Sequence, residues 1–240
     1  MTPDDLTGEE AAGLLTLDPD VSTVVFACGA KGSGKSHLTT ALFAAYPYDR
    51  LLIDPTGDVD PFHEITTPAP ATPPDEWPQA EEGERASLRV RPNRRNATRV
   101  RDGAHKGLPQ WKADTDQWVA LAMDHGRTAV YIDDAGDLLA VNRVPPNTDD
   151  MLHTMRHRNV PLFANTIRPV GIDSLIITQA DKVAVFEVGH ELDVRRLAPF
   201  LHVTPDELYA LVRQVDTERH EFLLYDAKRR ELFHCDPLPS

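Results

Sequence analysis

A segment beginning at Gly29 has the composition and spacing of a phosphate-binding loop. The motif G-x-x-x-x-G-K-[ST] is matched at every fixed position by Gly29, Ala30, Lys31, Gly32, Ser33, Gly34, Lys35 and Ser36, and His37 extends the predicted nucleotide-binding segment. Its glycines let successive backbone N–H groups converge on phosphates at the positive end of a helix. Lys35 is expected to neutralise the β- and γ-phosphates, and Ser36 to offer its hydroxyl to Mg²⁺. The segment therefore predicts ATP and Mg²⁺ as ligands.

Two adjacent aspartates follow the apolar run Ala129-Val130-Tyr131-Ile132. A P-loop needs a further carboxylate to hold Mg²⁺, and Asp133 at the end of a strand meets that need. Asp134 stands where hydrolysing P-loop ATPases carry the carboxylate that activates water. An alternative is that the pair caps the following helix. The first interpretation makes Asp133 a metal ligand and Asp134 a catalytic base.

Strands and helices alternate around these motifs. Apolar runs predict strands at 21–28, 51–53, 88–91, 128–132, 162–166 and 182–188, and periodicity and capping predict helices at 35–46, 114–126, 148–158, 172–177 and from 205. Residues 221–225 and 231–234 flank a turn and predict a hairpin. We therefore expect an α/β fold of the P-loop NTPase class (RecA-like, ASCE). It has a mostly parallel sheet with helices on both faces and a C-terminal β-hairpin.

Length and composition are consistent with one domain over residues 1–240. The chain is 41% hydrophobic, and its apolar runs fall short of the roughly 20 residues of a membrane span. Residues 66–84 hold five of the 20 prolines and predict an inserted loop or spacer without a core of its own. The acidic start and the two sparse cysteines, Cys28 and Cys235, predict a cytoplasmic protein that is not an integral membrane protein.

Charge is distributed unevenly along the chain. The net charge is −13, yet residues 85–112 contain nine bases and one acid, whereas residues 1–27 contain six acids and no base. A protein that coats nucleic acid with its whole surface is therefore excluded, but one confined positive face is not. A solvated arginine-rich loop is the alternative interpretation.

Four ordered blocks resemble the FtsK/HerA superfamily of DNA-pumping ATPases. They are CGAKGSGKSHL, LLIDPTGD, VYIDDAGDLL and TMRHRNVPLFANTIRP, and the resemblance covers about residues 20–190. The superfamily includes chromosome translocases, conjugative coupling proteins and viral genome-packaging ATPases. The acid pair and the small size are most similar to the packaging enzymes.

The resemblance implies partners and further site residues. It implies a homo-oligomeric ring, hexameric in form, that packages double-stranded DNA, with a docking protein at a capsid or membrane. It places the protein in a host cytoplasm or at a virion vertex. Arg156 corresponds to an arginine finger inserted into the neighbouring subunit's site; its alternative role is to balance the helix dipole. Asn165 or Thr166 replaces the family's usual sensor glutamine, because Ile167 stands at that position.

The basic stretch gains a candidate role from the same resemblance. The pore of a ring would be lined by Arg91, Arg94, Arg95, Arg99 and Arg101, together with Arg89, Lys106 and Lys112. Few aromatic residues accompany these bases, which favours duplex DNA over single strands.

Other functions remain open from the sequence. A P-loop phosphotransferase, a small-molecule or nucleotide kinase acting without DNA, would use the arginines as a lid. A nucleotide-dependent switch that binds protein partners is a third possibility. His153 and His157 have metal-ligand spacing but lack the acid of H-E-x-x-H, so they are interpreted as surface histidines. Asp54 resembles the family's strand-end aspartate and fits a turn equally well.

Overall fold

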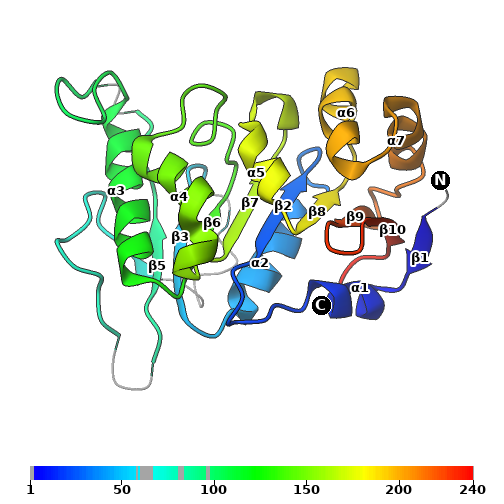
Figure 1. The fold of residues 1–240 in the computed structure, drawn as a ribbon, viewed down its shortest axis with the longest axis horizontal. Coiled ribbons are helices and arrows are strands. Elements are labelled where there is room, and N and C mark those ends of the chain that lie inside the picture. Colours follow the sequence, from blue (N-terminus) through cyan, green and yellow to red (C-terminus); the bar gives the residue numbers. More distant parts are fainter. Residues whose placement is uncertain (1–2, 58, 60–66, 81–83, 96–97, 240) are drawn as a thin grey trace.

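One mixed sheet organises the chain in the computed structural model, which describes residues 3–57, 59, 67–80, 84–95 and 98–239. Within these residues ten strands form the order β1-β10-β9-β8-β2-β7-β6-β3-β5-β4 (Figure 1). The strands are β1 (Asp4–Leu6), β2 (Val24–Cys28), β3 (Asp49–Ile53), β4 (Thr67–Pro68), β5 (Ser87–Val90), β6 (Thr128–Ile132), β7 (Leu162–Thr166), β8 (Lys182–Val185), β9 (Phe222–Asp226) and β10 (Glu231–Cys235).

The centre of the sheet is parallel and fully buried. Strand β2 pairs with β7 on one side and β8 on the other, and β7 pairs with β6. Every residue of β2, β6 and β7 is buried, as expected for apolar strands covered on both faces. Because these strands are parallel, the residues that follow β2, β6 and β7 emerge at one edge of the sheet. The P-loop, the aspartate pair and the residues after Thr166 therefore share that edge.

Helices cover both faces, as the sequence predicts. The helices are α1 (Gly8–Leu15), α2 (Lys35–Ala45), α3 (Gln110–His125), α4 (Pro146–Arg158), α5 (Ser174–Gln179), α6 (Glu191–Leu197) and α7 (Pro205–Val212). Side chains of alternate residues in β2 pack into two different hydrophobic cores, one on each face of the sheet. Phe26 packs in the core that includes α3 to α7, whereas Val25 and Ala27 pack with α1 and α2. The mostly parallel P-loop fold is therefore confirmed.

The C-terminal hairpin is present and receives an additional N-terminal strand. Strands β9 and β10 are antiparallel, and β1 pairs in parallel with β10 at the sheet edge. Helix α1 follows β1 and begins with a capping box, in which Thr7 and Glu10 exchange hydrogen bonds. Strand β10 thus joins the N-terminal strand β1 to the rest of the sheet.

The Pro-rich stretch contributes to the main core rather than acting only as a spacer. Its short strand β4 pairs with β5. Trp77 is buried, donates through Nε1 to Asp49 Oδ2 at 2.8 Å, and stacks on His125 with 5.3 Å between ring centroids. The stretch therefore adds Trp77 to the main core of the domain.

Helix α3 begins four residues earlier than predicted. Pro109 precedes its first turn, and the Gln110 Nε2 group donates to Asp114 Oδ1 at 2.8 Å. Asp114 therefore lies inside the helix as an i+4 partner and does not cap it. In the part of the chain that the structure describes, none of the helices has the length and apolar character needed to cross a bilayer.

Candidate nucleotide-binding site

The predicted P-loop connects β2 to α2, which is the context that its motif requires. Gly34 lies at the N-cap of α2 with φ of 106°, a conformation that favours glycine. A Cβ there would stand 3.2 Å from both His220 Cβ and Phe186 Cε1. Glycine is therefore needed at this position both for the turn and for the close approach of two other segments.

Lys35 is held over the loop that it is expected to serve. Its Nζ donates to the carbonyl oxygen of Ala30 at 2.7 Å, and the residue is only 7% exposed. Burial lowers the pKa of the ammonium, an effect that Asp133 and Asp134 partly oppose. The cation is thus close to the loop and close to the aspartate pair.

Asp133 is joined to the P-loop helix by hydrogen bonds. Ser36 Oγ donates to Asp133 Oδ1 at 3.2 Å, and the hydroxyl of Tyr131 donates to the same oxygen at 2.9 Å. Thr39, one turn after Ser36, donates to the Tyr131 hydroxyl at 2.8 Å. Tyr131 was not predicted as a functional residue, although its position two residues before Asp133 places both side chains on one face of the strand. The structure thus brings the predicted metal-binding pair together.

Asn165 occupies the space between the two acidic residues and the P-loop. Its Nδ2 donates to Asp133 Oδ1 at 2.8 Å and to Ser36 Oγ at 3.2 Å, while its Oδ1 accepts from the backbone N–H of Asp134 at 2.8 Å. Asp134 has φ of 45°, so this hydrogen bond supports a left-handed conformation. The nearby Thr166 is buried, and its hydroxyl accepts from the backbone N–H of Arg168.

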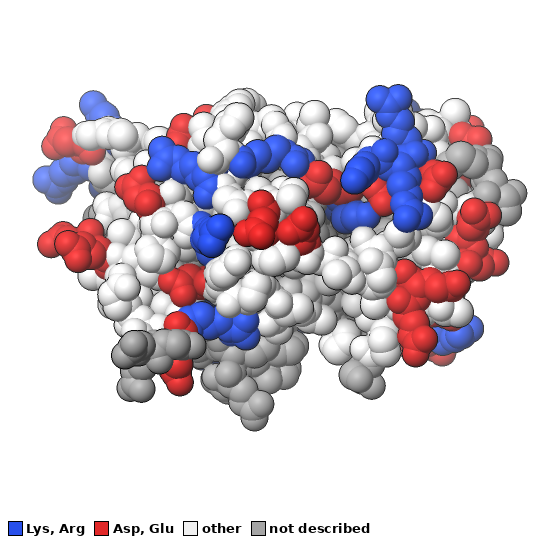
Figure 2. Space-filling view, turned by 60° about the horizontal axis from the view of Figure 1, so that its bottom comes forward, with Lys and Arg blue, Asp and Glu red and all other residues white. Residues whose placement is uncertain are grey.

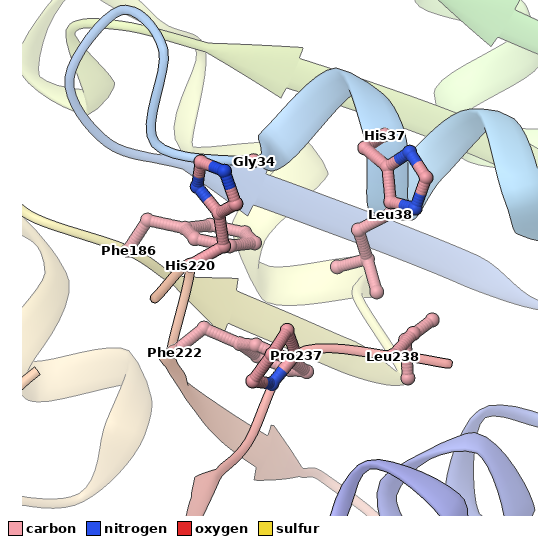
Figure 3. Close-up of a pocket in the computed structure, with 8 residues that line it drawn as sticks. All are labelled: Gly34, His37, Leu38, Phe186, His220, Phe222, Pro237 and Leu238. Atoms are coloured by element: carbon pink, nitrogen blue, oxygen red, sulfur yellow. The ribbon is translucent and has the colours of Figure 1, made fainter. Parts of the chain in front are cut away.

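A pocket of about 340 Å³ opens beside the P-loop (Figure 3). It is lined by Gly34, His37, Leu38, Phe186, His220, Phe222, Pro237 and Leu238. Of these, Gly34 and His37 belong to the predicted nucleotide-binding segment. The other lining residues were not predicted to lie near this segment, because most of them, at 186 and 220–238, are far from the motif along the chain.

Arg156 lies near the beginning of β2, whereas the P-loop follows the end of that strand. Its Nη2 donates to both carboxylate oxygens of Asp181 at 3.0 Å, and Asp181 Oδ2 accepts from the backbone N–H of Val24 at 2.8 Å. Val24 begins β2, whereas the P-loop follows its last residue, Cys28. The four residue steps between them span about 13 Å. Arg156 therefore does not reach the phosphate site of its own chain.

The basic stretch begins after β5, at the same edge as the P-loop. The side chains of Arg91, Arg95, Arg99, Arg101 and Lys106 are exposed, and that of Arg94 is partly exposed and paired with Asp137. Arg89 and Lys112 are buried at 4% and 7% exposure, so the expectation that they line a pore is wrong. Figure 2 shows Lys and Arg interspersed with Asp and Glu on the face it displays.

A buried carboxylate anchors the end of this basic loop. Asp116 is fully buried and accepts from the backbone N–H and the hydroxyl of Thr148 at 2.7 and 2.6 Å, at the start of α4. Its other oxygen is 2.7 Å from His105 Nε2. Asp116 thus fixes the loop against α3 and α4 together.

Two weaker sequence signals have local explanations. Asp54 Oδ1 accepts from the Gly57 backbone N–H at 2.7 Å, and burial raises the pKa of its carboxyl group. This contact matches the turn-forming interpretation. His153 and His157 are exposed on α4, and no group of three potential metal ligands from His, Cys, Asp and Glu occurs among the described residues.

Solved structures with similar folds include viral packaging enzymes. The DNA-packaging ATPase B204 from Sulfolobus turreted icosahedral virus is 17% identical with a TM-score of 0.67, over 93% of this chain and 100% of that chain. B204 from Sulfolobus turreted icosahedral virus 2, in complex with AMP, is 19% identical with a TM-score of 0.66 over the same shares. VirB4 of Thermoanaerobacter pseudethanolicus is 10% identical with a TM-score of 0.63, over 95% and 92%.

These similarities establish the fold and confirm the P-loop NTPase expectation. No protein-family model matches the sequence, and no curated protein matches it.

Proposed function

From the premise that the chain has the fold of FtsK/HerA-type P-loop ATPases, we propose that it is an ATP-hydrolysing motor that packages double-stranded DNA into a viral capsid. The observation that carries the proposal is the single hydrogen-bonded unit formed by Ser36, Asp133, Asp134 and Asn165 at the end of the P-loop. It joins a phosphate-binding loop to an acid pair suited to hydrolysis. The phosphotransferase alternative has no comparable support.

The P-loop residues bind the triphosphate. Backbone N–H groups of residues 31–36 surround the phosphates at the start of α2, and Lys35 supplies a cation. When nucleotide binds, the ammonium exchanges its contact with the Ala30 carbonyl for phosphate oxygens. This exchange is favourable because a charged acceptor forms the stronger hydrogen bond.

Ser36 and Asp133 provide the oxygen atoms that Mg²⁺ prefers. Their side-chain oxygens are 3.2 Å apart, and Asp133 is 4% exposed. A site with one or two protein oxygens is typical for Mg²⁺, because substrate phosphates and water supply the remaining ligands. When bound, the ion neutralises charge on the β- and γ-phosphates. Asn165 and Tyr131 orient Asp133 for this role.

Asp134 activates the attacking water. Its backbone N–H is fixed by Asn165, and its side chain is half-buried at the edge where the P-loop lies. It takes a proton from the water that attacks the γ-phosphate. Asn165 and Thr166 then serve as the sensor, because both lie at the end of β7 beside the loop: the backbone N–H of Gly29 donates to the Thr166 carbonyl at 3.2 Å.

Arg156 acts on the site of a neighbouring subunit. It lies about 13 Å or more from its own P-loop along β2, so a role in hydrolysis requires a second copy of the chain. Its side chain is 41% exposed, and it exchanges its contact with Asp181 for the phosphates held by such a neighbour. A ring, hexameric in form, supplies one finger to each site.

Arginines at the P-loop end of the strands contact the DNA backbone. Arg91, Arg94, Arg95, Arg99 and Arg101 follow β5, at the same end of the strands as the P-loop. Contacts to phosphates hold duplex DNA without reading its sequence.

The proposal is tested by measuring ATPase rate with and without duplex DNA, together with mass in solution. A ring whose turnover rises with DNA supports the motor. A monomer with DNA-independent turnover would contradict it, and transfer of phosphate to an added acceptor would favour a kinase.

A further inference from the structure

The pocket beside Gly34 continues directly from the phosphate-binding loop. Gly34 is both a residue of the P-loop motif and a lining residue of the pocket, and His37 and Leu38 lie in the first turn of α2. A nucleotide whose phosphates are held at residues 31–36 must extend its sugar and base past that turn. The pocket volume of about 340 Å³ lies in the range of small-molecule sites.

We propose that this pocket binds the base of the nucleotide, and that His37 and His220 retain it by stacking. This inference rests on the proposed binding of ATP. It assigns a base-binding role to residues at the C-terminal end of the chain, which the P-loop motif does not include.

The pocket has an apolar floor and an aromatic rim. Phe186 and Phe222 stack on each other with ring centroids 5.2 Å apart, and both are almost fully buried. The imidazole rings of His37 and His220 are exposed and lie on different sides of the pocket in Figure 3, with His220 beside Gly34. Flat aromatic rings at the opening and apolar groups beneath them suit the π-face of a base.

His220 is held in place by a hydrogen-bonded turn. Asp216 Oδ1 accepts from the backbone N–H groups of Glu218 and Arg219 at 3.0 and 3.3 Å. The backbone N–H of Asp216 donates to Glu221 Oε2 at 3.1 Å, and that of His220 donates to the Thr217 carbonyl at 3.2 Å. A fixed turn lowers the entropy that is lost when a ligand binds.

The C-terminal wall of the pocket is also tied down. The backbone N–H of Asp236 donates to the Leu6 carbonyl at 2.9 Å. The carbonyl oxygen of Pro237 lies only 2.1 Å from where a Cβ would stand on Gly8. Strand β1 and helix α1 thus hold the segment that carries Pro237 and Leu238 against the pocket.

The side chains that line the pocket determine which nucleotide bases it can bind. Of the eight described residues that line the pocket, only His37 and His220 have polar side chains. Stacking depends on the area of the ring and discriminates little by hydrogen bonding. We therefore expect ATP and GTP to bind similarly, and CTP to bind more weakly because its base is smaller.

The test compares nucleotide affinity with the affinity for inorganic tripolyphosphate, which has no base. His220→Asn removes the ring while tolerating the φ of 58° at this position. His37→Ala removes the other ring, and His37→Phe retains an aromatic ring there. His153→Ala, on the exposed surface of α4, is the matched control.

His220→Asn and His37→Ala should each weaken ATP binding roughly tenfold and leave tripolyphosphate binding unchanged. His37→Phe should recover most of the ATP affinity that His37→Ala loses, and His153→Ala should bind ATP as the unmodified protein does. Unchanged ATP affinity in both ring-removing variants would overturn the inference, as would an equal loss for ATP and tripolyphosphate. If the unmodified protein bound tripolyphosphate but gained nothing from the base, only the base pocket would fail. If it bound neither ligand, the proposed ATPase function itself would fail.

Discussion

The side-chain amide of Asn165 joins the two acidic residues of the candidate site. Its nitrogen donates to Asp133 Oδ1 at 2.8 Å, and its oxygen accepts from the backbone N–H of Asp134 at 2.8 Å. Asn165 is 2% exposed, so water does not replace these contacts when they are removed. One residue of β7 thus contacts both the carboxylate of Asp133 and the backbone of Asp134.

Replacing Asn165 with Leu should remove the contacts that join Asp133 to Asp134. The substitution keeps a similar volume but leaves the backbone N–H of Asp134 without its partner and removes one of the hydrogen bonds to Asp133 Oδ1. A cost of about 1–3 kcal/mol to the free energy of unfolding is expected from buried groups left unpaired. ATP should still bind through Lys35, whereas kcat should fall. Denaturant unfolding and steady-state kinetics measure the two effects, and an unchanged kcat would show that Asn165 does not position the acid pair.

Asp134→Asn should separate binding from turnover. The amide cannot accept a proton from water at neutral pH, so kcat should fall by about 10²-fold or more, while ATP affinity should stay near that of the unmodified protein. Asp124→Asn, which removes an exposed carboxylate on α3, is the control. Steady-state hydrolysis by Asp134→Asn at the control's rate would remove Asp134 as the base.

Arg156→Ala should lose hydrolysis by on the order of 10³-fold, as expected for an arginine finger. Mixing it with Lys35→Ala subunits should restore part of the activity, because an intact Lys35 then meets an intact Arg156 across an interface. A mixture of Arg156→Ala with the double variant lacking both residues offers no such interface and should stay inactive. Equal activity in the two mixtures would contradict action between subunits.

The buried Lys35 predicts how ATP affinity depends on pH. Its pKa is lowered because burial disfavours the ammonium. Below that lowered pKa the side chain is already charged and ready to meet phosphate. Above it, binding must first protonate the amine, so affinity should already fall with rising pH below the range in which an ordinary lysine loses its charge. Lys35→Arg stays charged throughout and should not show this fall if it binds. An identical pH profile in both proteins would assign the titration to another group.

Much of the fold followed from sequence because local signals agreed with each other. The strand at 128–132 and the helix beginning at Pro205 have the predicted positions, since apolar β-branched runs and a capping box with proline act locally. Helix α1 has a comparable local signal, Thr7 followed by Glu10, but this helix was not predicted. Helix α6 was missed as well, although acids in its first turn and bases in its last complement its dipole.

The site was predictable only where its chemistry is contiguous in sequence. Residues 29–36 and the aspartate pair can be recognised from the spacing of their residues alone. The contacts of Asn165 with Asp133 depend on two strands lying side by side, and the approach of His220 to Gly34 depends on the return of the C-terminal hairpin to the P-loop. Such long-range neighbours leave no local pattern, which is also why Trp77 was not expected in the core.

The central claim, that ATP hydrolysis moves this protein along duplex DNA, is tested most directly by displacement of a third strand. A triplex-forming oligonucleotide bound to duplex DNA should be released by the unmodified protein in the presence of Mg-ATP. It should remain bound with Asp134→Asn or when ATP is replaced by a non-hydrolysable analogue. Hydrolysis of ATP in the presence of the duplex without any release of the third strand would contradict the account.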